Sequence, residues 1–183
     1  VIYKDFSFIV VDGAVGFGNK KVMPAGPLRE PVAFGLSRAD AIVIVGEDKT
    51  GAADFVRRYT SVPILSASLA ADAANPDIRG KTVFAFAGIG RPQKFRETLE
   101  ALGATVGGWA EFPDHFAYQA EDLREMIAAA EAQNVPILTT AKDCVRLPEA
   151  LRVKVQKFTV HLIWQNAAEV VMLIEQALKK RKT

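Results

Sequence analysis

The chain has 183 residues, of which 50% are apolar and 24% are charged, a composition typical of soluble globular domains. Its formal net charge of +2 at pH 7 is too small for a nucleic-acid-binding surface, which concentrates Lys and Arg on one face. Cys144 is the single cysteine, which excludes an internal disulfide and a cysteine-rich metal site, and no apolar run reaches the roughly 18 residues of a membrane-spanning helix.

Short apolar runs recur along the chain and alternate with segments of helical periodicity. Runs that are apolar at consecutive positions suit strands buried on both faces of a parallel sheet. These runs are Ser7–Asp12, Ala41–Val45, Thr82–Phe86, Val135–Thr139 and Phe158–Ile163. The alternation predicts an α/β fold with a mostly parallel sheet flanked by helices, similar to a Rossmann fold.

Three later segments have the apolar spacing of helices. Pro92–Leu102 begins with a proline suited to the first helical position, and Ala120–Gln133 has acidic residues in its first turn. Ala167–Lys180 closes the chain. Its spacing predicts an inward face made of Val170, Val171, Ile174 and Leu178.

Two segments interrupt this rhythm. Gly13–Pro31 is a Gly/Pro-rich loop of a length that is uncommon unless it is functional. Val62–Arg79 alternates weakly, and we interpret it as an edge strand or an inter-domain linker. We therefore expect residues 1–75 to be the tail of an upstream domain with a linker strand, and residues 76–183 to form a second α/β domain. Because the chain opens almost directly onto a strand and without methionine, we expect it to be a piece of a longer protein.

The Gly13–Pro31 loop follows an expected strand at its carboxyl end, where α/β folds place their ligands. Asn19, Arg29 and Glu30 supply its polar groups. An arginine there can hold a phosphate or a carboxylate through two parallel hydrogen bonds. The alternative is a connecting loop whose Arg29 and Glu30 charges are solvated or pair locally.

Two further loops offer polar chemistry after expected strands. Gly88 and Gly90 lie in a strand-to-helix turn, which is either an anion site at a helix start or a turn that needs glycine for its geometry. Asp114 precedes His115 between a strand and a helix. A histidine oriented by polar neighbours can transfer protons or stabilise charge, whereas the simpler interpretation is that Asp114 caps the next helix.

The remaining polar residues give weaker signals. Lys142 and Asp143 follow a strand and either reach the same crevice as the other loops or begin a short helix. We interpret Cys144 as a small buried apolar residue and His161 as structural. Neither histidine has partners at metal-ligand spacing, so no metal site is predicted. The chain also lacks a Gly-x-x-x-x-Gly-Lys-Ser/Thr sequence, which excludes an independent P-loop nucleoside triphosphatase.

Taken together and in order, these motifs resemble the second half of the tetraacyldisaccharide 4'-kinases of Gram-negative lipid A synthesis. The resemblance covers essentially the whole chain. Its specific parts are Pro24-Ala-Gly-Pro-Leu-Arg-Glu30 and Phe112-Pro-Asp-His115. Val10-Val-Asp12, Gly18-Asn19, Phe84-Ala-Phe-Ala-Gly-Ile-Gly90 and Thr139-Thr-Ala-Lys-Asp143 support it.

The resemblance implies two α/β domains with the active site in the cleft between them. The upstream P-loop domain, of which residues 1–75 would be the C-terminal remnant, would bind ATP and Mg²⁺, supply the catalytic base and carry a membrane-association helix in its missing part. The whole protein would phosphorylate the 4'-hydroxyl of tetraacyldisaccharide 1-phosphate at the cytoplasmic face of the bacterial inner membrane. The fragment alone is expected to be soluble and inactive, to hold no cofactor and to bind no nucleic acid.

The resemblance also implies roles for single residues. Asp114 and His115 map onto a motif that reaches the catalytic cleft, and Arg29 and Glu30, with Asn19 nearby, map onto the lipid-substrate side. The last family motif usually reads Thr-Glu-Lys-Asp, but Ala141 replaces the glutamate here, which leaves the role of this strand end open. The alternatives are a stand-alone Rossmann-like domain that binds a nucleotide or sugar nucleotide, and a non-catalytic interaction domain. Nucleotide affinity of the isolated chain would favour the first alternative, whereas a broad apolar face without convergent polar groups would favour the second.

Overall fold

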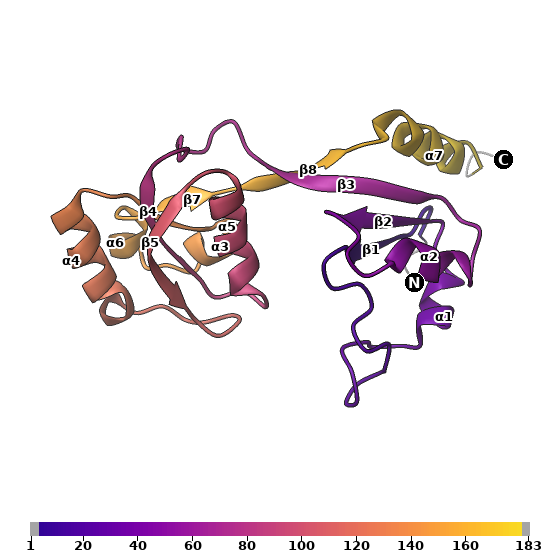
Figure 1. The fold of residues 1–183 in the computed structure, drawn as a ribbon, viewed down its shortest axis with the longest axis horizontal. Coiled ribbons are helices and arrows are strands. Elements are labelled where there is room, and N and C mark those ends of the chain that lie inside the picture. Colours follow the sequence, from indigo (N-terminus) through magenta and orange to yellow (C-terminus); the bar gives the residue numbers. More distant parts are fainter. Residues whose placement is uncertain (1–3, 181–183) are drawn as a thin grey trace. The chain divides into compact units, whose positions relative to one another are not determined.

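The computed structural model describes residues 4–180, which divide into two compact units (Figure 1). Unit 1 comprises the described parts of Val1–Ala70 and Leu162–Thr183, and unit 2 is Ala71–His161. The chain thus leaves unit 1 and later returns to it. The expected division after residue 75 differs from this one, chiefly because the expected second domain included the C-terminal residues that pack in unit 1.

Unit 1 is built on a four-stranded sheet of order β1-β2-β3-β8. The strands are β1 (Phe8–Asp12), β2 (Ala41–Val45), β3 (Ile64–Ala71) and β8 (Val160–Trp164). β1 and β3 both pair parallel with β2, all five residues of which are buried, as the apolar run predicts. β3 lies between β2 and β8, so the interpretation of this segment as an edge strand is wrong.

Helices cover both faces of the unit 1 sheet. Ile42 and Ile44 of β2 belong to one core cluster with Leu36 of α1 (Val32–Leu36) and Val56 of α2 (Ala52–Arg57). The intervening Val43 belongs to a second cluster that includes residues of α7 (Ala167–Lys180). The two-residue repeat of the strand therefore places alternate side chains against opposite layers.

The predicted inward face of α7 is wrong in most of its residues. Val170 is buried, but Val171, Ile174 and Leu178 are 55%, 40% and 51% exposed. Only Val170 and Leu173, three positions apart, belong to the cluster against the sheet. Periodicity identified an apolar stripe, but burial requires a partner, and within residues 4–180 the sheet reaches only part of that stripe.

Unit 2 contains a second four-stranded sheet, of order β5-β4-β6-β7, in which every pairing is parallel. Its strands are β4 (Thr82–Ala87), β5 (Thr105–Glu111), β6 (Ile137–Thr140) and β7 (Gln156–Phe158). The connecting helices are α3 (Pro92–Ala101), the 3₁₀ turn η1 (Ala120–Leu123), α4 (Arg124–Gln133), α5 (Ala141–Cys144) and α6 (Glu149–Arg152).

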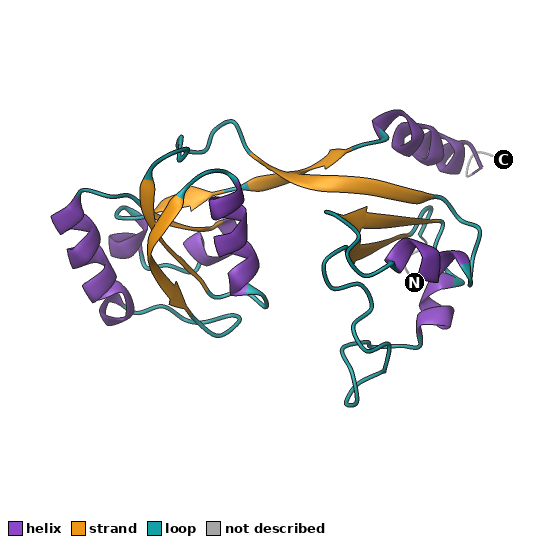
Figure 2. Cartoon of the chain, in the orientation of Figure 1, coloured by secondary structure: helices purple, strands orange, loops and turns teal. Residues whose placement is uncertain are grey.

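Alternate residues of β4 face two separate cores of unit 2. Val83 and Ala85 pack in a cluster with Leu99 of α3, whereas Phe84 packs in a cluster with Ile127 of α4. Helices therefore cover both faces of a parallel sheet (Figure 2). The expected α/β class with mostly parallel strands and flanking helices is confirmed.

The predicted strand Phe158–Ile163 is two strands that belong to different sheets. β7 ends at Phe158 and β8 begins at Val160. The intervening Thr159 turns its backbone to Asn75, whose side-chain amide donates to the Thr159 carbonyl at 2.6 Å and accepts from the Thr159 N–H at 2.8 Å. His161, which was interpreted as structural, has an exposed side chain on β8. None of the helices within residues 4–180 has the length and hydrophobicity needed to cross a membrane.

Candidate active site

Three loops of unit 2 meet beyond the carboxyl ends of neighbouring parallel strands. β4 ends at Ala87, β5 at Glu111 and β6 at Thr140, and β4 pairs with both of the others. Open α/β sheets bind their ligands at this edge. The three loops carry most of the polar residues that the sequence singled out in this half of the chain.

A buried carboxylate lies at the centre of these loops. Asp143 is fully buried, and its two oxygens accept hydrogen bonds from the Tyr118 hydroxyl at 3.0 Å and from the Thr140 hydroxyl at 2.6 Å. Arg146 Nη1 adds an ion pair at 3.4 Å. A buried charge is tolerated only when it is paired and hydrogen-bonded, and these three partners meet that requirement for Asp143. Asp143 therefore holds Tyr118, Thr140 and Arg146 together in the interior of the site.

The environment of Asp143 also changes the pKa of its partner Tyr118. Burial first, and then the charge of Asp143, raise the pKa of the Tyr118 hydroxyl well above its ordinary value. The hydroxyl therefore stays protonated as a hydrogen-bond donor. Gly88 makes room for it, since a Cβ atom at this position would lie 2.6 Å from the Tyr118 oxygen. Glycine at this position is required by packing.

Arg146 connects this buried centre to the exposed Asp114–His115 pair. Its Nη1 donates to the Gly88 carbonyl at 2.9 Å, and its Nη2 lies 3.3 Å from His115 Nδ1. On the other side of the ring, His115 Nε2 is 3.8 Å from Asp114 Oδ2. The structure therefore brings Gly88, Asp114, His115 and Asp143 into one connected group.

The backbone turns sharply at His115, which has a left-handed φ of 62°. Its N–H is held by Asp114 Oδ1 at 3.0 Å. This conformation is uncommon for residues other than glycine, and such residues cluster at functional sites. The His115 side chain is 81% exposed, so the ring is open to a ligand. Asp114 does not cap the next helix, because Gln119 and Asp122 form a capping box at the start of η1; that interpretation is wrong.

The other residues near this edge have simpler surroundings. Gly90 lies in the turn before α3, where Pro92 takes one of the first two helical positions as predicted. Lys142 is exposed in the short helix α5, whose N-cap Thr140 accepts a hydrogen bond from the Asp143 N–H. Cys144 is only partly buried, so its interpretation as a buried residue is wrong.

The Gly13–Pro31 loop belongs to unit 1 and is shaped by its own polar groups. The Asn19 side chain donates to the Ala25 carbonyl at 2.8 Å and accepts from the Lys21 N–H at 3.1 Å. Glu30 forms an ion pair with Arg38 of the following segment. Arg29 is exposed, and among residues 4–180 its guanidinium has no recorded polar partner. Arg29 is thus one available positive charge of the loop, in addition to the exposed Lys20 and Lys21.

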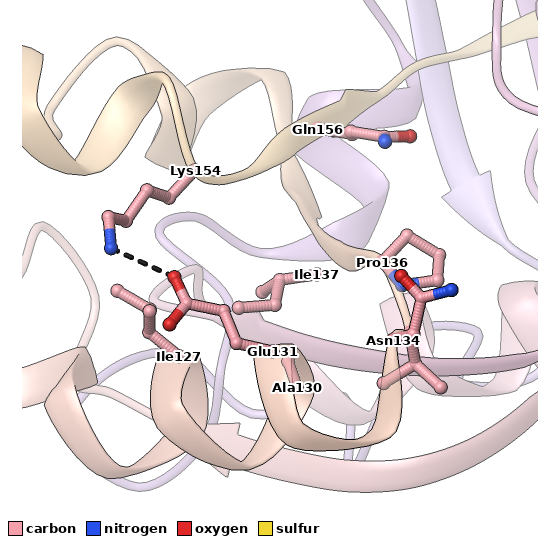
Figure 3. A pocket seen from close by; sticks show the side chains of 9 residues that line it. Ile127, Ala130, Glu131, Asn134, Pro136, Ile137, Lys154 and Gln156 are labelled. Carbon is pink, nitrogen blue, oxygen red and sulfur yellow. Dashed lines mark hydrogen bonds and ion pairs between the residues drawn. The ribbon is translucent and has the colours of Figure 1, made fainter.

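A separate cavity of about 410 Å³ lies at the opposite ends of the unit 2 strands, near the beginnings of β6 and β7 (Figure 3). Pro136, Ile137 and Gln156 line it, and its charged groups, Lys154 and Glu131, pair with one another at 2.9 Å. None of the site residues predicted from the sequence lines this cavity.

Sequence inspection missed Arg146 and Tyr118, although a local signal existed for the arginine. Asp143 and Arg146 are three residues apart, a spacing that brings side chains together on a helical turn. Tyr118 reaches Asp143 from 25 residues away, a relationship that no local pattern contains.

Comparison with known proteins gives matches over nearly the whole chain. The family model described as tetraacyldisaccharide-1-P 4'-kinase matches residues 1–181. The chain is 44% identical over 175 residues to the tetraacyldisaccharide 4'-kinase of Paramagnetospirillum magneticum, covering 96% of this chain and 54% of that protein. It is 50% identical over 166 residues to the same-named protein of Rhodospirillum centenum, covering 90% of this chain and 49% of that protein.

A solved structure shares the fold. It is described as the "apo" form of LpxK from Aquifex aeolicus in complex with ATP, and it matches with a TM-score of 0.65 and 23% identity. The match covers 96% of this chain and 53% of that one, so the chain spans about half the length of its relatives. On the family match and these identities, the chain belongs to the tetraacyldisaccharide-1-P 4'-kinase family.

Proposed function

We propose that this chain is the C-terminal part of an ATP-dependent kinase that phosphorylates the 4'-hydroxyl of tetraacyldisaccharide 1-phosphate in lipid A biosynthesis. The observation that carries the proposal is the family match over residues 1–181, together with relatives named as this kinase at 44% and 50% identity. The ATP named in the description of the Aquifex aeolicus structure supports ATP as the phosphoryl donor.

The residues of this chain do not fit a P-loop site for ATP and Mg²⁺. Gly80-Lys81-Thr82 matches the end of such a motif, but Asn75 replaces the first glycine, and the segment leads into strand β4. A P-loop instead follows a strand and opens a helix. Within residues 4–180 no group of three potential metal-ligating side chains is present. The proposal therefore assigns ATP and Mg²⁺ to the upstream half, and the fragment alone is expected to be inactive.

The contribution of this chain would be positioning and charge stabilisation, which are the main requirements of phosphoryl transfer. His115, supported by Asp114, is the catalytic candidate because its exposed ring stands at the ligand-binding edge of the sheet. Arg29 would hold a phosphate or sugar group of the lipid, in a loop whose shape Asn19 and Glu30 maintain. Gly88 and Gly90 would line the anion-facing turn.

The proposal places the whole protein at the cytoplasmic face of the inner membrane, attached through its upstream region. Its partner there would be the lipid A disaccharide precursor. In a cell lysate we expect the full-length protein in the membrane fraction and a variant without that upstream region in the soluble fraction. An unchanged distribution would contradict this location.

The test of function is the replacement His115→Ala in the full-length protein. We expect kcat to fall about 10²-fold to 10⁴-fold, the usual contribution of a positioned acid–base group. Folding should change little because the side chain is 81% exposed. His161→Ala is the comparison variant, since His161 is also exposed but is a residue of β8 rather than of these three loops. Wild-type turnover in His115→Ala would overturn the role of this residue.

Calorimetry with Mg-ATP separates this proposal from a stand-alone nucleotide-binding domain. We expect binding to the full-length protein and none to the 183-residue chain. Micromolar binding to the isolated chain would instead favour the stand-alone domain, because the site would then lie within its own residues.

A further inference from the structure

The guanidinium of Arg146 joins a fully buried carboxylate to an exposed histidine ring. Nη1 contacts Asp143 Oδ1 at 3.4 Å, and Nη2 contacts His115 Nδ1 at 3.3 Å. The three side chains differ sharply in exposure, at 0% for Asp143, 21% for Arg146 and 81% for His115. Arg146 therefore connects the rigid interior of unit 2 to the group that faces a ligand.

The position of the guanidinium is fixed from several directions. Nη1 also donates to the Gly88 carbonyl at 2.9 Å. Asp143 is itself held by the hydroxyls of Tyr118 and Thr140. A planar guanidinium held at one end by both a carbonyl and a carboxylate has little freedom at the other. Arg146 Nη2 is thus held in a fixed position beside His115 Nδ1.

This contact determines which nitrogen of His115 carries the proton. A guanidinium has only donors and does not lose its proton in proteins, so Nδ1 must be the acceptor of the contact. In the neutral imidazole one nitrogen is the donor and the other the acceptor, and the neutral ring therefore carries its proton on Nε2. Nε2 lies on the Asp114 side, 3.8 Å from Oδ2.

We propose that Arg146 is a positioning residue that holds His115 in its Nε2-protonated form and keeps that N–H on the exposed ring, beside Asp114. Such a preorganised donor suits an anionic oxygen, either of a phosphoryl group or of a carboxylate. A catalytic benefit of this tautomer rests on the proposed function of His115. The tautomer itself follows from the contact between Arg146 Nη2 and His115 Nδ1 alone.

A purely structural arginine is the rival interpretation, and the chain offers a matched control for it. Arg152 Nη2 donates to the Leu147 carbonyl at 2.8 Å, so it also supports the segment after α5. Within residues 4–180, the hydrogen bonds of Arg152 are with the Val145 and Leu147 carbonyls and not with His115. Replacing Arg146 and Arg152 separately by Met therefore distinguishes the loss of loop support from the loss of the histidine contact.

The first measurement is the tautomer of His115 in the full-length protein, labelled with ¹⁵N-histidine and studied at a pH where the ring is neutral. Correlations between ring nitrogens and ring protons distinguish the two tautomers, and their loss in His115→Gln assigns the signals. We expect the Nε2-protonated pattern in the wild type and in Arg152→Met. Arg146→Met should give a mixture of tautomers.

Arg146→Met leaves Asp143 buried without its ion pair and therefore can fail to fold. Combining it with Asp143→Asn removes the unpaired buried charge. The amide oxygen still accepts from one of the two hydroxyls, and the amide nitrogen can donate to the oxygen of the other. This double variant should show the same tautomer mixture. An Nε2-protonated pattern that persists in the folded double variant would overturn the proposal, and so would the same mixture in Arg152→Met.

Turnover supplies the second measurement. We expect kcat of the Arg146 variants to fall about 10-fold to 100-fold, as for other groups that orient a functional histidine, with little change in KM. Unchanged turnover with an altered tautomer would overturn the positioning role. If the full-length wild type shows no kinase activity, the proposed function fails, but the spectra still decide the Arg146 contact.

Discussion

The hydroxyl of Tyr118 donates a 3.0 Å hydrogen bond to the carboxylate of Asp143 in a region that excludes water. Tyr118 is 2% exposed and Asp143 is fully buried. The bond joins the loop after β5 to the helix α5 after β6, and Arg146 connects the same carboxylate to His115. It therefore links the stability of unit 2 to the geometry of the candidate site.

Replacing Tyr118 by Phe should destabilise the chain by about 1–3 kcal/mol, because it removes one of three partners of a buried carboxylate. The aromatic packing against Phe86 and Phe112 is retained, so the loss isolates the hydroxyl. Urea unfolding measures the difference. Tyr59→Phe is the control, since Tyr59 is 52% exposed and should lose less than about 0.5 kcal/mol. Equal stabilities for wild type and Tyr118→Phe would contradict the structure.

Alkaline titration gives a second prediction for Tyr118. Burial, followed by the charge of Asp143, raises the pKa of Tyr118 in the folded protein, so the folded state binds this proton more tightly than the unfolded chain does. The resulting stability is complete below the unfolded tyrosine pKa of about 10 and is lost as the pH rises above it. Tyrosinate absorbance of Tyr118, taken as the difference between wild type and Tyr118→Phe, should therefore appear only with unfolding. Its appearance in the folded protein near pH 10 would contradict this expectation.

The sequence was sufficient for the parts of this structure that depend on local patterns. The buried run Ala41–Val45 identified β2 to the residue, and Pro92 identified the start of α3. β5 was expected before Phe112 but had no clear limits, because Gly107-Gly108 interrupts its apolar pattern. A Cβ atom on Gly108 would lie 2.8 Å from the Phe84 ring, so the glycine serves a contact with another strand that a single sequence does not display.

The candidate site was predictable only in part for the same reason. Asp114 and His115 are adjacent and recognisable as a motif. Arg146, which contacts His115, and Gly88, whose carbonyl accepts from Arg146, come from two other loops. Arg146 lies 31 residues after His115. For α7 the sequence predicted more burial than the structure shows. The apolar stripe is present, but within residues 4–180 the sheet covers only part of it.

The two glycines of the β4–α3 turn should differ in their tolerance of alanine. At Gly88 a Cβ atom would lie 2.6 Å from the Tyr118 oxygen, whereas at Gly90 the nearest recorded atom is Asp114 Oδ2 at 3.7 Å. Gly88→Ala should displace Tyr118 from Asp143 and cost about 1–3 kcal/mol, the usual effect of overpacking. Gly90→Ala should be near neutral. Thermal unfolding of both variants tests this, and equal melting temperatures would show that the turn relaxes without strain.

Asp48 should stabilise unit 1 in a pH-dependent way. Its two oxygens accept from the Ala52 and Ala53 N–H groups at 2.9 Å each, at the start of α2. The Ala53 N–H is the main cause of the lowered pKa of Asp48, and the Ala52 N–H adds to it. Asp48→Ala should therefore cost about 0.5–2 kcal/mol at neutral pH, as for other helix caps.

The sign of the pH effect follows from the lowered pKa of Asp48. Stability from this carboxylate is present above the unfolded pKa of about 3.9 and is lost as the pH falls through the lower folded value. The difference in urea unfolding between wild type and Asp48→Ala should thus begin to shrink below about pH 4 and disappear only below the lowered folded pKa of Asp48. Asp54→Ala is the control, because its 2.9 Å ion pair with Arg57 is highly exposed and should contribute little. A difference that is constant with pH would exclude the carboxylate as its source.

Asn75 should stabilise unit 2 by joining its two ends, which lie 84 residues apart in sequence at this contact. Its amide satisfies both the carbonyl and the N–H of Thr159, at 2.6 and 2.8 Å, where β7 gives way to β8. Asn75→Ala would leave the Thr159 N–H without its partner and should cost about 1–3 kcal/mol in urea unfolding. Asn75→Asp keeps the oxygen that accepts from this N–H but places a carboxylate oxygen against the Thr159 carbonyl, so it should also destabilise the protein. Wild-type stability of Asn75→Ala would contradict this role of Asn75.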